Sequence, residues 1–269
     1  MCRLSKNGQK ALVTGGAGAI GCAIASGLLQ KGYDVTIVVR AHHQGVATLD
    51  ALAPDRGLPI AFEVCDLSLR REIEALSERW EGPLHVLINN AATCPRKKTH
   101  TSEGIEMQWA TNVLGYFGMI KAFESALRCA DTARIINVAS YWAGGLNIKD
   151  PEFNHRSYDN DTAYRQAKQA DRMLTRAFAD RLSASHITVN SCHPGDVRSK
   201  LSGDLGFGGH ESPRQGAATP LYLATDDAVA HVSGQYFAHL QPQRCGFSVD
   251  THAVTKLHDL CESYDQSTD

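Results

Sequence analysis

Short apolar runs alternate with longer segments of helical spacing along most of the chain. The apolar runs are four to six residues long and rich in Val, Ile and Leu, which predicts buried strands. These strands are expected at residues 11–14, 34–39, 60–64, 84–88, 133–138, 186–191 and 234–238. Helices are expected at residues 19–30, 44–52, 67–80, 103–128, 162–183, 213–224 and 251–264, whereas residues 143–160 are expected to be irregular.

The strict alternation of strands and helices predicts an α/β fold. Strands joined through helices must run parallel, so the pattern indicates a doubly wound parallel sheet of about seven strands, covered on both faces. No linker, repeat or low-complexity tract divides the chain, which is therefore expected to form a single domain over residues 1–269. Its core is expected at about residues 10–238, with a C-terminal helix at about 251–264.

A glycine-rich loop follows the first predicted strand and opens the first predicted helix. Gly16, Gly18 and Gly21 fit the spacing G-x-G-x-x-G of a dinucleotide-binding turn. Glycines allow a tight turn and a close approach of the backbone to a pyrophosphate, whose charge then faces a helix N-terminus. Ordinary glycine-rich turns can show the same spacing, but this context favours a Rossmann-type dinucleotide-binding domain.

The end of the second predicted strand bears on the choice of cofactor. An acidic residue there would bind an adenosine ribose and favour NAD, but the chain has Arg40 after Val38 and Val39. A guanidinium can hold a 2′-phosphate through paired hydrogen bonds, so the sequence favours NADP (NADPH) over NAD. The alternative is that Arg40 is only a solvated strand end.

Tyr164 and Lys168 form a candidate catalytic pair. They lie four residues apart on a predicted helix, so their side chains share one face. An ammonium beside a phenol favours the phenolate and is expected to lower the pKa of Tyr164. A phenol of this kind can exchange a proton with an alcohol or a carbonyl oxygen. Alone, the pair could also be an ordinary solvated helix face.

These features together resemble the short-chain dehydrogenase/reductase family over about residues 10–237. The resemblance also rests on Asp66-Leu67 after the third strand, Asn89-Asn90-Ala91-Ala92 after the fourth and Asn112 in the following helix. Ser140 ends the fifth strand, and Pro194-Gly195 follows the sixth.

The resemblance implies a role for each matching residue. Tyr164 would be the general acid/base, and Lys168 would lower the pKa of Tyr164 and bind the nicotinamide ribose. Ser140 would bind the substrate oxygen, and Asn112 would hold a relay water. The implied catalytic residues are Asn112, Ser140, Tyr164 and Lys168. The implied cofactor-binding residues are Gly15, Gly16, Gly18, Ala19, Ile20, Gly21, Arg40, Asp66, Leu67, Asn90, Ala91, Ala92, Tyr164, Lys168, Pro194, Gly195 and Val197.

Within the family, the sequence is similar to the retinol dehydrogenase-like group. The similarity rests on residues 193–200, 212–219, 222–225 and 234–237, and on the long separation of Ser140 from Tyr164. It implies an NADP-dependent oxidoreductase that transfers hydride between nicotinamide and an alcohol/carbonyl pair, such as an apolar aldehyde, ketone, retinoid or steroid. The glycine spacing also resembles epimerase-type relatives. An epimerase or dehydratase that retains its nucleotide, and a non-catalytic NADP-sensing module, therefore remain alternatives.

Irregular segments are expected to form the walls of the substrate pocket. They cover residues 93–101, 141–161 and 197–212 and carry Tyr141, Trp142, Phe153, Tyr158, Leu201, Leu205 and Phe207. Such side chains suit apolar carbonyl compounds, although they could instead pack within their own loops. Glycines at 203, 206, 208 and 209 suggest that the third segment is a flap that closes on binding.

Composition limits the partners. Lys plus Arg (27) nearly balance Asp plus Glu (29), which argues against nucleic-acid and anionic-membrane surfaces. No signal peptide or membrane anchor is apparent, so a soluble, cytoplasmic protein is expected. The eight cysteines lack C-x-x-C spacing, which favours free thiols, and no metal site is expected. The family resemblance implies a homodimer or homotetramer formed through the helices at 103–128 and 162–183.

Overall fold

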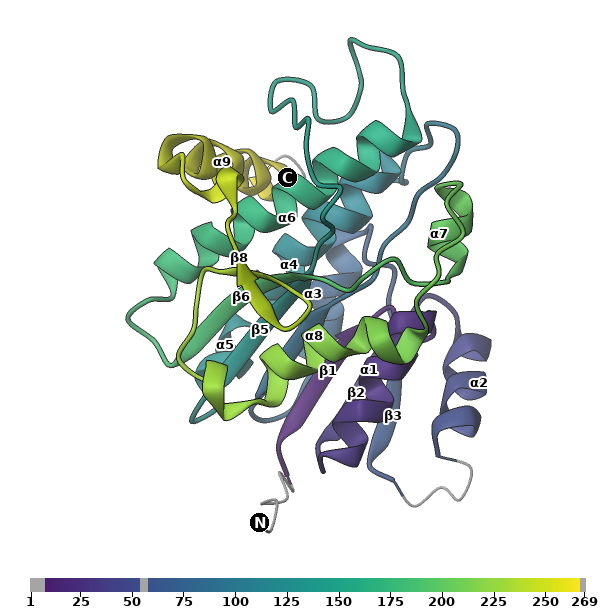
Figure 1. Ribbon diagram of the computed structural model, residues 1–269, viewed down its shortest axis with the longest axis vertical. Coiled ribbons are helices and arrows are strands. Elements are labelled where there is room, and N and C mark those ends of the chain that lie inside the picture. The colour runs from purple at the N-terminus through teal and green to yellow at the C-terminus, as the bar shows by residue number, and fades with distance from the viewer. Residues whose placement is uncertain (1–7, 54–57, 267–269) are drawn as a thin grey trace.

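An eight-stranded sheet forms the centre of the protein (Figure 1). The computed structural model describes residues 8–53 and 58–266. The strands are β1 (Lys10–Thr14), β2 (Asp34–Val39), β3 (Ile60–Val64), β4 (Val86–Asn89), β5 (Ala133–Val138), β6 (Ile187–His193), β7 (Tyr236–Ala238) and β8 (Gln241–Gln243). Their order is β3-β2-β1-β4-β5-β6-β7-β8, and only β8 pairs antiparallel, with β7. Because the order reverses at β1, a crevice is expected outside the carboxyl ends of β1 and β4.

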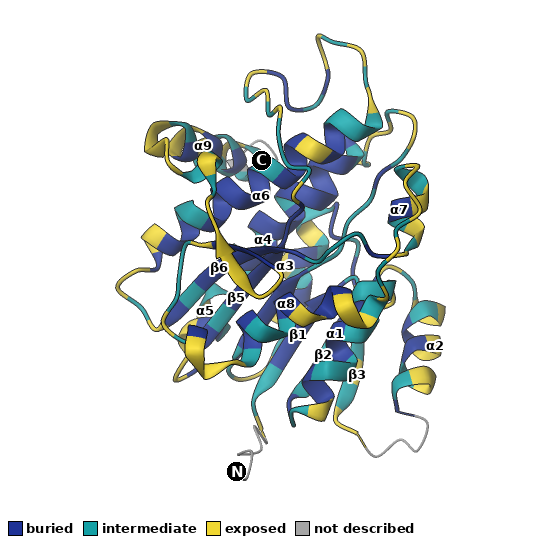
Figure 2. Cartoon of the chain, in the orientation of Figure 1, coloured by how far each residue is buried: buried dark blue, intermediate teal, exposed yellow. Residues whose placement is uncertain are grey.

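Helices cover both faces of the sheet. The helices are α1 (Ala19–Gln30), α2 (His42–Leu52), α3 (Arg70–Glu78), α4 (Gly115–Ala122), α5 (Glu124–Arg128), α6 (Asn160–Arg181), α7 (Lys200–Asp204), α8 (Pro213–Thr225) and α9 (Thr251–Gln266). Alternate strand residues point to opposite faces. Ala11 and Val13 therefore pack with α1 and α8, whereas Leu12 packs with α3, α4 and α6. Figure 2 shows these inner surfaces buried, with exposed residues at the periphery.

The α/β fold and the parallel sheet predicted from the sequence are confirmed. The count of about seven strands was one too low, because β8 is a short edge strand of exposed polar residues and proline. Such a strand carries no apolar run that could reveal it.

Most of the long helix predicted at 103–128 is helical, but it begins only at residue 107 and is not a single α-helix. A π-helix, η1 (Trp109–Leu114), leads into α4, and Phe123 separates α4 from α5. A π-helix adds one residue to a helical turn and is common at functional sites. The apolar spacing hides this change because Trp109, Val113 and Phe117 still point into the core.

The C-terminal helix α9 packs along α6, as the two neighbouring ribbons show (Figure 1). Leu257 and Cys261 of α9 are fully buried, and the ring of His258 lies 5.3 Å from Phe117 of α4 and 5.6 Å from Phe178 of α6. The Lys121 ammonium of α4 binds Glu262 at 2.5 Å and Asp265 at 2.6 Å. Within one chain, α9 therefore occupies part of the surface of the helix pair predicted to self-associate.

None of the helices in residues 8–53 and 58–266 combines the length and apolar character needed to cross a membrane.

Candidate active site

The glycine loop is folded tightly between β1 and α1. The Gly16 N–H donates to the Val38 carbonyl of β2, and the Gly18 N–H donates to the Gly15 carbonyl at 2.9 Å. A Cβ on Gly21 would lie 2.3 Å from the Gly15 oxygen, so no larger side chain fits there. Helix α1 begins immediately after Gly18 and has no acidic residue in its first turn. Its free N–H groups can therefore receive an anion.

A cavity of ≈ 400 Å³ opens at the carboxyl ends of β1, β2 and β4. Most residues predicted to bind the cofactor line it, namely Gly15, Gly18, Ala19, Ile20, Gly21, Arg40, Asp66, Leu67, Asn90, Ala91 and Ala92. Gly16 does not, because it packs against Ile37. Tyr164, Lys168, Pro194, Gly195 and Val197 also lie outside its lining. The cavity volume lies in the range of small-molecule sites. The cavity extends from the glycine loop to Arg40 at the end of β2.

Some residues of the cavity lining were not among those predicted to bind the cofactor. Ala17, Gln44, Cys65 and Thr111 were not predicted for either part of the site, whereas Thr93, Cys94, Ser199, Lys200, Leu201 and Asp204 lie in segments predicted to line the substrate pocket. The flap residues sit on α7, whose first turn is closed by a capping box between Ser199 and Ser202. The S-x-x-S spacing is the sequence signal that could have revealed this helix.

The ends of β1 and β4 are tied together beneath the cavity. The Thr14 hydroxyl accepts hydrogen bonds from the backbone N–H groups of Asn90 (2.8 Å) and Ala91 (3.1 Å). The Asn90 side chain in turn donates to the Thr14 carbonyl at 2.9 Å. Asp66 accepts from the backbone and hydroxyl of Ser68, at 3.0 and 2.7 Å, which fixes its carboxylate at the end of β3. These bonds hold the cavity walls in place without a ligand.

Tyr164 lies on α6 and is only 8% exposed. The Ser140 side chain, which follows β5, hydrogen-bonds the phenol and lowers its pKa, but burial has the larger effect and raises the pKa above its usual value of 10. Asp171, Cys94 and Asp196 raise the pKa further. The pKa of Tyr164 was predicted to be lowered by Lys168, and this prediction is wrong because removal of the phenol from water disfavours the phenolate.

Lys168 lies one turn after Tyr164 and is 2% exposed. Its ammonium donates to the Val138 carbonyl at 2.9 Å, to the Asp171 carboxylate at 2.9 Å and to the Tyr116 hydroxyl at 3.4 Å. It also lies 5.9 Å from the centre of the Tyr164 ring. The two side chains share a helix face, but the ammonium is directed to acceptors of the protein interior.

Asn112 lies in η1 and binds the loop after β4. Its amide donates to the Thr93 carbonyl at 2.9 Å and accepts from the Thr93 N–H at 2.8 Å. Among the residues that the structure describes, no hydrogen bond joins Asn112 directly to Lys168. The relay between them that the family resemblance implies stays a prediction.

Pro194, Gly195 and Val197 lie in the turn after β6. Gly195 has φ +99°, and a Cβ there would overlap the Glu211 carboxylate. Val197 is buried and pairs with Glu211 in an isolated bridge between the two ends of the flap. The turn thus requires glycine at 195 and joins the end of β6 to the flap.

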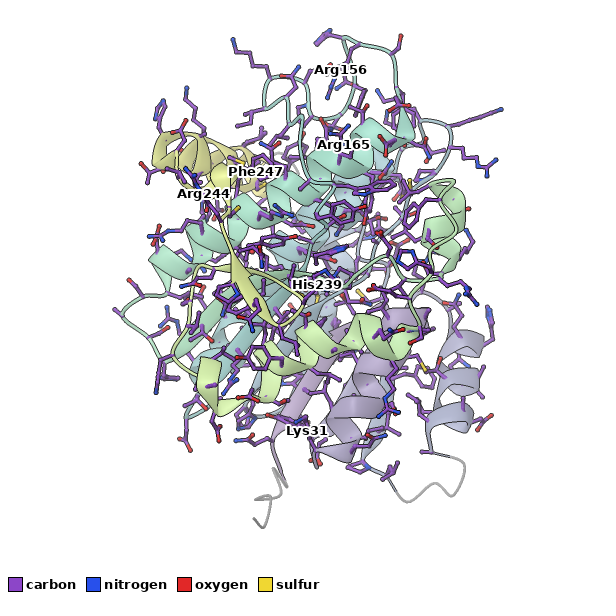
Figure 3. All side chains as sticks on the ribbon, viewed as in Figure 1. Lys31, Arg156, Arg165, His239, Arg244 and Phe247 are labelled. Atoms are coloured by element: carbon purple, nitrogen blue, oxygen red, sulfur yellow. The ribbon has the colours of Figure 1, made fainter. Side chains whose placement is uncertain are left out.

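The aromatic residues predicted to line the substrate pocket fall into two groups. Tyr141 packs on His193 with ring centres 4.6 Å apart, and Trp142 packs on Phe207 of the flap at 4.7 Å. Phe153 and Tyr158 instead pack on each other, and the Arg156 guanidinium lies 3.8 Å above Phe153. These two rings pack within the loop before α6, which is the alternative given above, and Arg156 of this loop lies beyond Arg165 at the far end of the molecule (Figure 3). Their contact with a substrate stays a prediction.

Within residues 8–53 and 58–266, no group of three or more His, Cys, Asp or Glu side chains could hold a metal ion. The cysteines at 22, 65, 94, 129, 192, 245 and 261 are free thiols.

Comparison with known proteins gives consistent results. A family model described as short chain dehydrogenase matches residues 9–206. A probable oxidoreductase of Streptomyces lividans is 35% identical over 88% of this chain and 86% of its own length. Mouse retinol dehydrogenase 14 is 30% identical over 95% of this chain and 85% of its own. A solved structure from Mycobacterium paratuberculosis superposes with a TM-score of 0.83 at 25% identity, over 97% of this chain and 95% of that one.

Proposed function

Since the chain belongs to the short-chain dehydrogenase family and is an NAD(P)-dependent oxidoreductase acting on CH–OH groups, we propose that it uses NADP and interconverts an apolar carbonyl compound and its alcohol. The observation that carries this proposal is the Ser140–Tyr164 pair beside the cavity. Cys94 lines the cavity and also lies near enough to Tyr164 to affect the pKa of its phenol, which connects the two parts of the site.

The choice of NADP is supported by the end of β2. Arg40 lines the cavity and is exposed, so its guanidinium is available to a 2′-phosphate. No acidic side chain stands between Val38 and Gln44 to bind a ribose hydroxyl in competition. The cavity lining also includes Lys200 of α7, whose ammonium pairs with the Asp204 carboxylate at 2.6 Å.

The residues fit a dinucleotide, and each has a defined task. The turn from Gly15 to Gly21 would hold the pyrophosphate against the N-terminus of α1, with Asp66 and Asn90 at the sides of the cavity. When bound, NADPH supplies the hydride. Ser140 would hold the substrate oxygen, and Tyr164 would give that oxygen its proton as the carbonyl carbon accepts the hydride.

The direction of proton transfer follows from the burial of Tyr164. Because burial raises the pKa of Tyr164, the phenol keeps its proton at neutral pH. A protonated phenol can donate its proton to a carbonyl oxygen, which is the step that reduction needs. The substrate itself would contact Tyr141, Trp142 and Phe207, whose rings suit an apolar compound.

The proposal is tested by following NADPH oxidation with a panel of apolar aldehydes and ketones. Net consumption of NADPH is expected with at least one of them, and Tyr164→Phe should lower kcat by about 10²–10⁴-fold while NADPH binding is retained. Tyr33→Phe is the matched control, because Tyr33 is equally buried but lies in the turn before β2. NADPH binding without any turnover would favour a sensing module, and isomerisation without net NADPH consumption would favour an epimerase.

A further inference from the structure

Helix α6 carries a further titratable residue, Asp171, one turn below Lys168. Asp171 follows at the seventh position from Tyr164, so all three side chains share one helix face. The Asp171 carboxylate accepts from the Lys168 ammonium at 2.9 Å, and the two side chains are 0% and 2% exposed. The other carboxylate oxygen, Oδ1, has no hydrogen-bond partner among the described residues. Lys168 is thus the polar side chain that Asp171 binds.

The ammonium has three protons and three acceptors in this position. Besides Asp171 it binds the Val138 carbonyl of β5 and the Tyr116 hydroxyl of α4. Tyr116 itself donates to Val138. These three acceptors therefore determine the position of the Lys168 ammonium. Among the described residues, Asp171 is the only negatively charged group bound to it.

The phenol and the two thiols nearest the pair carry no charge near neutral pH. Burial raises the pKa values of Tyr116, of Cys192 on β6 and of Cys261 on α9. Arg172 is the next residue of α6, but its guanidinium binds the Ser140 carbonyl and stacks on Tyr236. Asp196, in the turn after β6, is a further negative charge near Tyr164.

We infer that Asp171 is a positioning residue for this active site: its carboxylate holds the Lys168 ammonium beneath Tyr164 and offsets its positive charge. The inference rests on the proposed function, since it assigns Asp171 a part in the proton chemistry of that site. A neutralised pair does little to stabilise a phenolate, so Tyr164 keeps its proton as a reductase requires. Without Asp171, an unpaired ammonium would act on the phenol at full strength.

The decisive variant is Asp171→Asn, which keeps the shape and removes the charge. In NADPH-dependent reduction, the pH above which kcat declines should fall by about one unit, because an unopposed cation lowers the pKa of a nearby acid by about 1–3 units. Asp180→Asn is the matched control: Asp180 lies on the same helix, is half-exposed and pairs with Arg176 at 2.6 Å. Its pH profile should match that of the wild type.

A purely structural role for Asp171 predicts a different result. Asp171→Asn would then melt at a lower temperature but show an unchanged pH profile, and that outcome overturns the inference. Asp171→Glu provides the conservative rescue, because it restores the charge one methylene further out. The inference requires its pH profile to stay close to that of the wild type even if kcat and KM change, and a profile that follows Asp171→Asn contradicts it.

A second measurement needs neither cofactor nor substrate. Tyrosine phenolate absorbance is recorded as the pH is raised, for the protein with Tyr164 and for its Tyr164→Phe variant. The difference between the two curves is the phenolate absorbance of Tyr164. In the Asp171→Asn background this absorbance should appear at lower pH than in the wild-type background, and an unchanged onset refutes the inference. If no carbonyl compound is reduced by any form of the protein, the proposed function fails, while this titration still decides the role of Asp171.

Discussion

Asn112 and Thr93 are joined by two hydrogen bonds that run in opposite directions. The Thr93 N–H donates to Oδ1 of Asn112 at 2.8 Å, and Nδ2 of Asn112 donates to the Thr93 carbonyl at 2.9 Å. Asn112 is fully buried in the π-helix η1, and Thr93 lines the cavity after β4. One amide thus satisfies both backbone groups of a loop residue at the cofactor site.

Replacing this amide is expected to weaken both folding and cofactor binding. Asn112→Ala leaves the N–H and carbonyl of Thr93 unpaired, which should lower the free energy of unfolding by about 1–3 kcal/mol. The loosened loop should also weaken NADPH binding, measured by fluorescence titration. Asn147→Ala is the control, because Asn147 is exposed and makes a local bond to Lys149. Wild-type stability in Asn112→Ala would contradict the role given to this bond pair.

The features that could be predicted are those with a signal in their own residues. The bounds of β2, β3, β5 and α1 agree with the prediction because each has a pattern of apolar residues in its own sequence, although β3 itself is half-buried or exposed. The π-helix around Asn112 was missed, since one extra residue in a turn leaves the apolar face intact. The short helix α7 was missed because its stability comes from a cap and from packing of the flap, not from an apolar stripe.

The site shows the same division between local and tertiary information. Except for Ala17, the residues of the glycine loop that line the cavity were predicted, because a backbone turn is encoded by its own residues. The environment of Lys168 was not predicted. Its partners come from β5, α4 and the next turn of α6, and only the folded chain brings Val138 and Tyr116 to the ammonium. The direction of the pKa shift of Tyr164 was likewise hidden, because burial is a property of the whole fold.

Arg40 is expected to determine the preference between NADP and NAD. Arg40→Ala should weaken NADPH binding by about 10–100-fold, because hydrogen bonds between charged groups contribute about 1.5–3 kcal/mol. NADH binding should change little, since NADH has no 2′-phosphate. His43→Ala is the control: His43 is an exposed neighbour on α2 that does not line the cavity. Equal losses for both cofactors would show that Arg40 does not distinguish them.

His193 is expected to make the protein less stable in mild acid. It is 7% exposed, its Nδ1 lacks a hydrogen-bond partner among the described residues, and burial lowers its pKa from 6.5 to about 4. The unfolded chain therefore binds a proton at a pH where the native protein does not. The contribution of neutral His193 to the free energy of unfolding is fully present above pH 6.5. It is lost as the pH falls toward 4, by about 3 kcal/mol in total.

The measurement is urea unfolding of wild type and His193→Leu at several pH values. The variant should lose less stability than the wild type between pH 7 and about 4.5. The difference between the two proteins is the informative quantity, because burial raises the pKa of Asp171 to about 6 and this carboxyl acts in the opposite direction. His231→Leu, at an exposed position, should follow the wild-type curve. Parallel curves for wild type and His193→Leu would refute the assignment.

The contact between α9 and the helix pair α4/α6 determines whether that surface is available to a second copy. Lys121 lies between two carboxylates of α9, Glu262 and Asp265. Lys121→Glu places three negative charges together and should lower the free energy of unfolding by about 1–2 kcal/mol, since each partly exposed pair contributes about 1 kcal/mol or less and repulsion is added. Lys256→Glu, on the exposed side of α9, should leave stability unchanged.

Self-association through α4 and α6 stays a prediction, and the same variant tests it. While α9 covers Phe117 and Phe178, a second copy can reach only the uncovered parts of the two helices. We therefore expect light scattering to show stronger, concentration-dependent association for Lys121→Glu than for wild type or Lys256→Glu, because a loosened α9 exposes these rings. A stable wild-type dimer that Lys121→Glu leaves unchanged would instead place the interface on a surface that α9 does not touch.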